Sequence, residues 1–260
     1  MKSKICSVTM GVVGCFSMLL FAQNVIAASA VQQIQPDSQN TEKTILNENI
    51  AMDALDEANE LLNSKQPQRA MDVLQPAIQY FEKYQNSQFD RIYAANGTAE
   101  TLLYLMLGTN EQNNIRVFSG CWAELYFTEA YAFIEMNDMQ NAQIKLKHAL
   151  ALSPFNSEFL KELGFIQQVG QQWQASVESF KMAEAYLYLI GVKEKRLSIQ
   201  QGVRRSLGVS LIELNRLEEA TQYFKKVLNV DPSDQKARNE LKYIEELKNG
   251  HEVKKSIGRV

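Results

Sequence analysis

Residues 207–232 read LGVSLIELNRLEEATQYFKKVLNVDP, and this stretch decides the fold of the chain. Small residues stand at Gly208 and Ala220, Phe224 adds apolar bulk, and Pro232 follows a second apolar segment that it cannot continue as a helix. The same order of small, small and bulky residues occurs in three earlier segments, namely Ala58, Ala70, Leu74; Ala130, Ala142, Leu146; and Gly164, Ser176, Phe180. Small residues at two such positions predict pairs of antiparallel helices that approach each other closely.

The spacing of these segments resembles that of the tetratricopeptide repeat. Gly164 lies 34 residues after Ala130, and a repeat of about 34 residues is typical of this two-helix unit, which stacks into a solenoid. The resemblance implies an all-α, right-handed solenoid of antiparallel helix pairs. A generic helical bundle has no reason to repeat at this interval, so we prefer the solenoid.

Two intervals depart from the period. Ala58 to Ala130 is 72 residues, two periods plus four, and we therefore expect an atypical helical unit at 86–122. Gly164 to Gly208 is 44 residues, one period plus ten, and the extra residues fall near 191–200. A helix extension is favoured over a loop there, because the segment is rich in good helix formers.

These intervals divide the chain. We expect a signal peptide at 1–27, a flexible spacer at 28–40, a solenoid at 41–250 and a loose tail at 251–260. Within the solenoid we expect units at about 51–84, 86–122, 123–156, 157–190 and 201–234, followed by a capping helix at 234–248. An amphipathic last helix covers the apolar face that the final unit would otherwise expose.

The first 27 residues have the pattern of an export signal. Lys2 and Lys4 precede an almost wholly apolar stretch, and small residues follow it. Cleavage is expected after Ala27, with Ala30 as the second choice. Two alternatives are a retained membrane anchor, for which the apolar run is short, and lipidation at Cys15. A periplasmic protein with no stable membrane span after cleavage is therefore the expectation, and secretion or anchoring is the alternative.

Composition and motifs argue against several classes of function. The formal charge is −3, from 27 basic and 30 acidic residues, which does not suit a nucleic-acid-binding domain. The chain has two histidines and none of the common catalytic or phosphate-binding motifs. We therefore predict no catalytic residues, no metal site and no cofactor.

What the resemblance offers is a groove lined by the first helix of each unit, where extended peptides or partner helices bind. Carried over by helix face, the candidate residues of this groove are Glu124, Phe127, Tyr131, Lys161, Phe165, Gln168, Arg205 and Val209. The two aromatic residues Tyr131 and Phe165 could equally pack between neighbouring units. The family's terminal-carboxylate clamp is incomplete here, because Phe165 stands where an asparagine belongs.

The sequence therefore predicts a non-enzymatic scaffold for protein–protein interaction in the cell envelope, with a partner whose identity stays open. The alternative is a binder of an anionic polymer or lipid through a basic cluster, formed by Lys193, Lys195, Arg196 and Arg204 together with Arg205. A solvated helix face would explain the same cluster. An enzyme with an unrecognised site is the third hypothesis.

Overall fold

The computed structural model describes residues 38–83, 89–111 and 114–250, with side chains described from Glu48 onward. The predicted signal peptide, most of the predicted spacer and the predicted tail lie outside these residues. The chain divides into two compact units, Met1–Leu46 and Asn47–Val260, and all packing below refers to the second.

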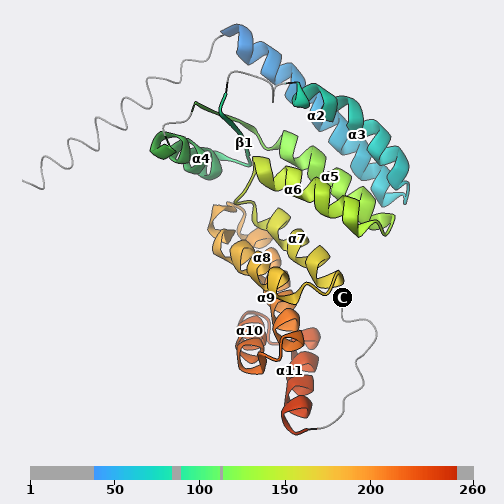
Figure 1. The fold of residues 1–260 in the computed structure, drawn as a ribbon, viewed down its shortest axis with the longest axis vertical. Coiled ribbons are helices and arrows are strands. Elements are labelled where there is room, and N and C mark those ends of the chain that lie inside the picture. The colour runs from blue at the N-terminus through green and yellow to red at the C-terminus, as the bar shows by residue number, and fades with distance from the viewer. Residues whose placement is uncertain (1–37, 84–88, 112–113, 251–260) are drawn as a thin grey trace, which may run out of the picture. The chain divides into compact units, whose positions relative to one another are not determined.

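Helices dominate the described residues, and they follow one another as pairs (Figure 1). The helices are α2 (Ser38–Asn63), α3 (Pro67–Glu82), α4 (Thr98–Glu111), α5 (Cys121–Glu135), α6 (Met139–Leu152), α7 (Ser157–Val169), α8 (Trp173–Ala185), α9 (Lys193–Glu213), α10 (Leu217–Val230) and α11 (Gln235–Lys248), with a short 3-10 helix η1 at Leu187–Leu189. From α5 to α11, each helix packs on the helix that follows it in the chain. Helix α3 packs on α5, so the helix that ends one pair contacts the helix that comes next in the stack, with α4 left out. The predicted all-α solenoid of helix pairs is confirmed.

The same turn closes every pair. Lys65, Asn137, Gln171 and Asn215 occupy the left-handed region, with φ between 56° and 60°. In each turn this residue donates its N–H three residues back, and the next residue donates five residues back, as from Asn215 to Ile212 and from Arg216 to Leu211. This is the Schellman arrangement at a helix C-terminus. Its recurrence places the four turns at the intervals predicted for the repeats.

Close packing inside each pair explains the columns of small residues. A Cβ on Gly208 would lie 2.5 Å from Cζ of Phe224, and one on Gly164 would lie 2.7 Å from Cε1 of Phe180. The other two pairs combine alanine with leucine at these positions, and all four of those side chains are fully or almost fully buried. The small residue and the bulky residue therefore compensate each other in volume.

Apolar side chains form two large clusters along the stack. One runs from α2 to α7 and includes Phe159 and Ile166; the other runs from α7 to α11 and includes Leu160. Helix α7 contributes to both clusters, so the core continues from one pair to the next, as expected when repeats bury their faces against neighbours.

The unit expected to be helical at 86–122 contains one helix, α4, but it also contains two strands that the sequence did not predict. Strands β1 (Arg91–Ala95) and β2 (Ile115–Ser119) pair in parallel, with Arg91 opposite Ile115, and α4 makes the crossover between them. Runs of five residues are too short for a stable helix, whereas β-branched and aromatic residues suit a strand. Gly108 lies inside α4, where the Ile115 side chain leaves no room for a Cβ.

A stack of aromatic rings connects this β-α-β unit to the helix pairs. Tyr93 stacks on Tyr104 with ring centroids 4.8 Å apart, Tyr104 on Phe155 at 5.8 Å, and Phe155 lies against Tyr186 at 4.6 Å. Ser153 at the end of α6 also donates its hydroxyl to the carbonyl of Ala94. The unit is thereby fixed beside the second and third helix pairs.

The ten extra residues lengthen a helix, as favoured from the sequence. Helix α9 begins at Lys193, eight residues before the unit boundary expected at 201. Helix α11 begins after Asp234, whose carboxylate accepts the N–H of Ala237, and this helix packs on α10. The predicted spacer extended to residue 40, but α2 already begins at Ser38.

Gly208→Ala should lower the free energy of unfolding by roughly 1–3 kcal/mol, because the added methyl overlaps the Phe224 ring. Adding Phe224→Leu recreates the alanine–leucine combination of the first two pairs. The free energy of unfolding of the double variant should therefore exceed the value expected from adding the losses of the two single variants by about 1 kcal/mol or more. Urea unfolding of the four proteins measures this coupling.

Gly202→Ala is the matched control, since it lies in the same helix and its Cβ would meet nothing within 4 Å. That change should stabilise the protein by about 0.5–1 kcal/mol, because alanine favours the helix. Equal effects of the two glycine substitutions would contradict the close packing.

Candidate functional site

The first helices α5 and α7 place some of the predicted groove residues on one face. Glu124, Phe127 and Tyr131 fall at intervals of three and four residues along α5, so they lie on the same side of it. Phe127 stacks on the buried Phe159 of α7 with ring centroids 4.6 Å apart, and is a packing residue between the two helices. Tyr131 lies edge-on to Phe127 at 5.3 Å and remains 38% exposed. Tyr131 is therefore the accessible aromatic residue of this face.

A charged pair accompanies Tyr131. The Lys161 ammonium lies 2.7 Å from the Glu162 carboxylate on α7. Burial raises the pKa of the Tyr131 phenol, and the nearby charges of Glu162 and Glu158 raise it further. Tyr131 stays a neutral hydrogen-bonding group as a result. We call Phe127, Tyr131, Lys161 and Glu162 the α5–α7 face.

Other predicted groove residues have structural roles. Gln168 is buried and donates its amide to the Ser206 carbonyl at 2.9 Å and to the Ser210 hydroxyl at 2.8 Å, which ties α7 to α9. Phe165 is half-buried against the first apolar cluster, and Val209 is half-buried against the second.

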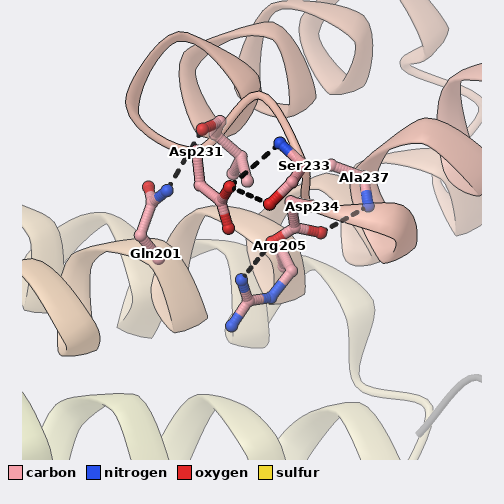
Figure 2. A network of polar contacts seen from close by, with 7 residues as sticks. Gln201, Arg205, Asp231, Ser233, Asp234 and Ala237 are labelled. Carbon is pink, nitrogen blue, oxygen red and sulfur yellow. Dashed lines mark hydrogen bonds and ion pairs between the residues drawn. The ribbon is translucent and has the colours of Figure 1, made fainter.

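Arg205 also has a structural partner. Its guanidinium donates to Asp234 at 2.6 Å, while the same carboxylate caps α11 at Ala237, and Asp231 binds Ser233 next to it (Figure 2). Arg205 thus holds the capping helix on α9.

The basic cluster of the sequence is not one patch of unpaired charge. Lys195 pairs with Glu158 of α7 at 2.8 Å, and Arg204 pairs with Glu184 of α8 at 2.7 Å. Arg196 donates to the carbonyl of Ile190 at 3.1 Å, and Lys193 is exposed. Partners on two different helices divide the cluster, because successive residues of a helix point in different directions.

A cavity of about 300 Å³ lies where both departures from the repeat period meet. Its lining comes from four segments of the chain, and the residues are Asn96, Glu100, Glu124, Asn156, Ser157, Glu158, Tyr186, Leu189, Ile190, Gly191, Val192 and Lys195. Asn96 lies between β1 and α4, and Glu100 lies in the first turn of α4. The η1–α9 segment gives the last five. Glu124 belongs both to the cavity and to the side of α5 that carries Tyr131.

Three carboxylates and one ammonium group line this cavity. Glu100 is 6% exposed and accepts the backbone N–H of Asn96 at 2.7 Å, and Glu124 accepts the Asn96 side-chain amide at 3.0 Å. Glu158 holds Lys195. Burial raises the pKa of Glu100, and it raises that of Glu124 to about 7, although the Asn96 amide opposes this shift. The Glu124 carboxyl is therefore partly protonated near neutral pH.

Sequence reasoning found Glu124 and Lys195 but assigned them to separate sites, and it missed the remaining lining residues. The signal was present in the two intervals that exceed the period, at 86–122 and 191–200. An interpretation of both segments as additional helix gave no reason to expect contacts between them.

Within residues 48–250, apart from the gaps, no group of three or more His, Cys, Asp or Glu side chains is arranged to hold a metal ion. None of the described helices combines the length and the apolar character needed to cross a membrane.

Comparison with known proteins agrees with the repeat. A family profile described as tetratricopeptide repeat matches residues 123–156 and 206–234. No curated protein matches the chain.

Solved structures resemble the chain at low identity. MamA 41-end from Desulfovibrio magneticus RS-1 matches with a TM-score of 0.52 and 14% identity, covering 78% of this chain and 87% of that one. The MamA RS-1 ArsTM double mutant gives the same score and identity over 78% and 86%. The first TPR of Spaghetti (RPAP3), bound to the HSP90 peptide SRMEEVD, covers 49% of this chain and 93% of its own, with a TM-score of 0.43 and 16% identity. At these identities the likeness to the MamA structures is one of fold.

Glu124→Gln should change how stability depends on pH. The folded pKa of Glu124, about 7, lies above its ordinary value of 4.5, so the folded protein binds more protons than the unfolded chain between these values. The wild-type free energy of unfolding should therefore fall as pH rises through this window. Glu124→Gln removes this contribution, and urea unfolding at about pH 5 and about pH 8 should show a smaller decrease.

Glu178→Gln, on the exposed side of α8, serves as the control and should keep the wild-type pH dependence. A Glu124→Gln protein with the wild-type slope would show that Glu124 is well solvated.

Proposed function

We propose that this chain, a tetratricopeptide-repeat protein, catalyses no reaction and holds a partner protein or peptide on the α5–α7 face. The observation that carries the proposal is Tyr131, which remains 38% exposed between the buried aromatic packing of Phe127 and the Lys161–Glu162 pair. Tyrosine is enriched at interfaces because it supplies a large apolar area together with a polar hydroxyl.

The face combines groups that suit an extended segment. An aromatic ring, an ammonium group and a carboxylate lie close together, so a partner could bury an apolar side chain and satisfy hydrogen bonds at the same place. The second helices α6 and α8 support this surface through the shared core, which keeps it preorganised and lowers the entropic cost of binding.

We also propose export of the chain to the cell envelope, on the pattern of its first 27 residues. The mass of the mature protein tests this directly. A chain that starts at Ala28 supports cleavage after Ala27, whereas a mature chain that starts at Met1 contradicts it.

The alternative, an anionic polymer or lipid bound through the basic cluster, gains no support from the geometry. Lys195, Arg204 and Arg205 each face a carboxylate at 2.6–2.8 Å. A ligand that recruited these three residues would first have to break three ion pairs.

A photo-reactive amino acid at Tyr131 should cross-link a partner in envelope extract, and one at Ile144 should not. Ile144 is the control because it is 44% exposed but lies on the second helix α6. The captured protein is then produced, and its affinity is measured by calorimetry. Tyr131→Ala should weaken binding by at least about tenfold, as for an interface hot spot. Equal cross-linking from both positions, or unchanged affinity of Tyr131→Ala, would contradict the proposed face.

A further inference from the structure

The cavity at the N-terminal end of α5 and α7 has an excess of negative groups. Among its lining residues Glu158 has a cationic partner, Lys195, at 2.8 Å. Glu100 and Glu124 accept hydrogen bonds from the neutral backbone and side chain of Asn96. The Lys195 ammonium also acts on the charge of Glu124, so one cation faces three carboxylates in this cavity. Burial raises the pKa of both carboxyl groups, and the single charge of Lys195 does not offset this effect at Glu124.

A second observation is independent of the acids. Ser157 lines the same cavity and is 3% exposed, and among the described residues no hydrogen bond reaches its Oγ. A buried hydroxyl without a partner costs free energy, so it indicates a group that is absent from the isolated chain. Glu100, Glu124 and Ser157 together offer three acceptors, and an ammonium group has three N–H donors.

The walls fit the rest of such a ligand. Leu189, Ile190 and Val192 give one side of the cavity an apolar character, which suits the methylene chain that carries the amine of lysine. The volume of about 300 Å³ is at the lower end of the range for ligand sites, enough for one side chain or one small amine. An anion would face three carboxylates here, so a cation is the complementary charge.

We propose that this cavity binds an alkylammonium group, carried either by a lysine side chain of the partner segment or by a free small amine. The lysine source rests on the proposed function, because a segment lying on the α5–α7 face would pass Glu124, which also lines the cavity. Specificity for a basic residue at one position of the partner then comes from the cavity, and affinity for the rest of the segment comes from the face.

The test uses the full mature chain and three probes. The first is n-butylamine, the second a short peptide with a central lysine between apolar residues, and the third the same peptide with norleucine, which keeps the methylene chain and lacks the ammonium. Amide NMR signals of Asn96 and Gly191 report binding, because both residues line the cavity.

The lysine peptide should shift these signals and bind at least about tenfold more tightly than the norleucine peptide. Binding of the lysine peptide more tightly than n-butylamine identifies a partner segment as the source, and equal binding identifies a free amine. No shift with either amine, or equal affinity for lysine and norleucine, overturns the proposal. The partner captured through Tyr131 is measured separately, so either proposal can fail alone.

Two variants should act in opposite directions. Glu124→Gln removes one acceptor charge and should lower the affinity for the lysine peptide by about tenfold or more. Lys195→Ala removes the ammonium group that pairs with Glu158 and should raise the affinity for the same peptide several-fold. A variant that merely disturbs the fold cannot produce both results, and weaker binding to Lys195→Ala would contradict the charge argument. Glu178→Gln should leave the affinity unchanged.

Discussion

The structure depends on the close approach of the two helices in each pair. Glycine meets phenylalanine in the third and fourth pairs, and alanine is combined with leucine in the first two. This contact fixes the distance between the helices, while the left-handed residue at the turn fixes how the second helix returns. Because each pair leaves an apolar face exposed, the next pair must cover it, and α11 covers the last. The regular part of the molecule follows from these constraints.

The cavity with its carboxylates lies where two segments depart from the repeat period. A β-α-β unit replaces one helix pair after α3, and residues 193–200 lengthen α9. Both departures line one cavity, together with the N-terminal ends of α5 and α7. The regular repeats provide a rigid frame, and the irregular segments give it buried carboxylates that a uniform solenoid would not contain.

Much of the fold could be predicted from the sequence, because close helix contacts restrict residue size at fixed intervals. Gly208, Ala220 and Phe224 report such contacts directly. The strands could not be found in this way, since five-residue runs such as Ile115–Ser119 have no periodicity long enough to separate them from helix. The prediction of a helical unit therefore agrees with α4 and misses the two strands that flank it.

The site was less predictable for a different reason. Spacing along a helix predicts which face of the helix a residue occupies, but it does not predict which distant residues pack against that face. Gln168 and Arg205 were assigned to a groove, yet Ser210 and Asp234, more than 25 residues away in the chain, take up their hydrogen-bonding groups. Tyr131 on α5 and Lys161 on α7 were predicted for the same groove, and their role in binding a partner stays a prediction. The cavity needed contacts between four distant segments, which no local pattern encodes.

The central claim is that the two irregular segments partly bury Glu124 beside other acids. The most direct measurement follows the side-chain carboxyl carbon of Glu124 by NMR as a function of pH in the folded protein. The account predicts a midpoint of about 7. A midpoint close to the ordinary glutamate value of 4.5 would mean that water or a cation already reaches this carboxylate, and it would contradict the account.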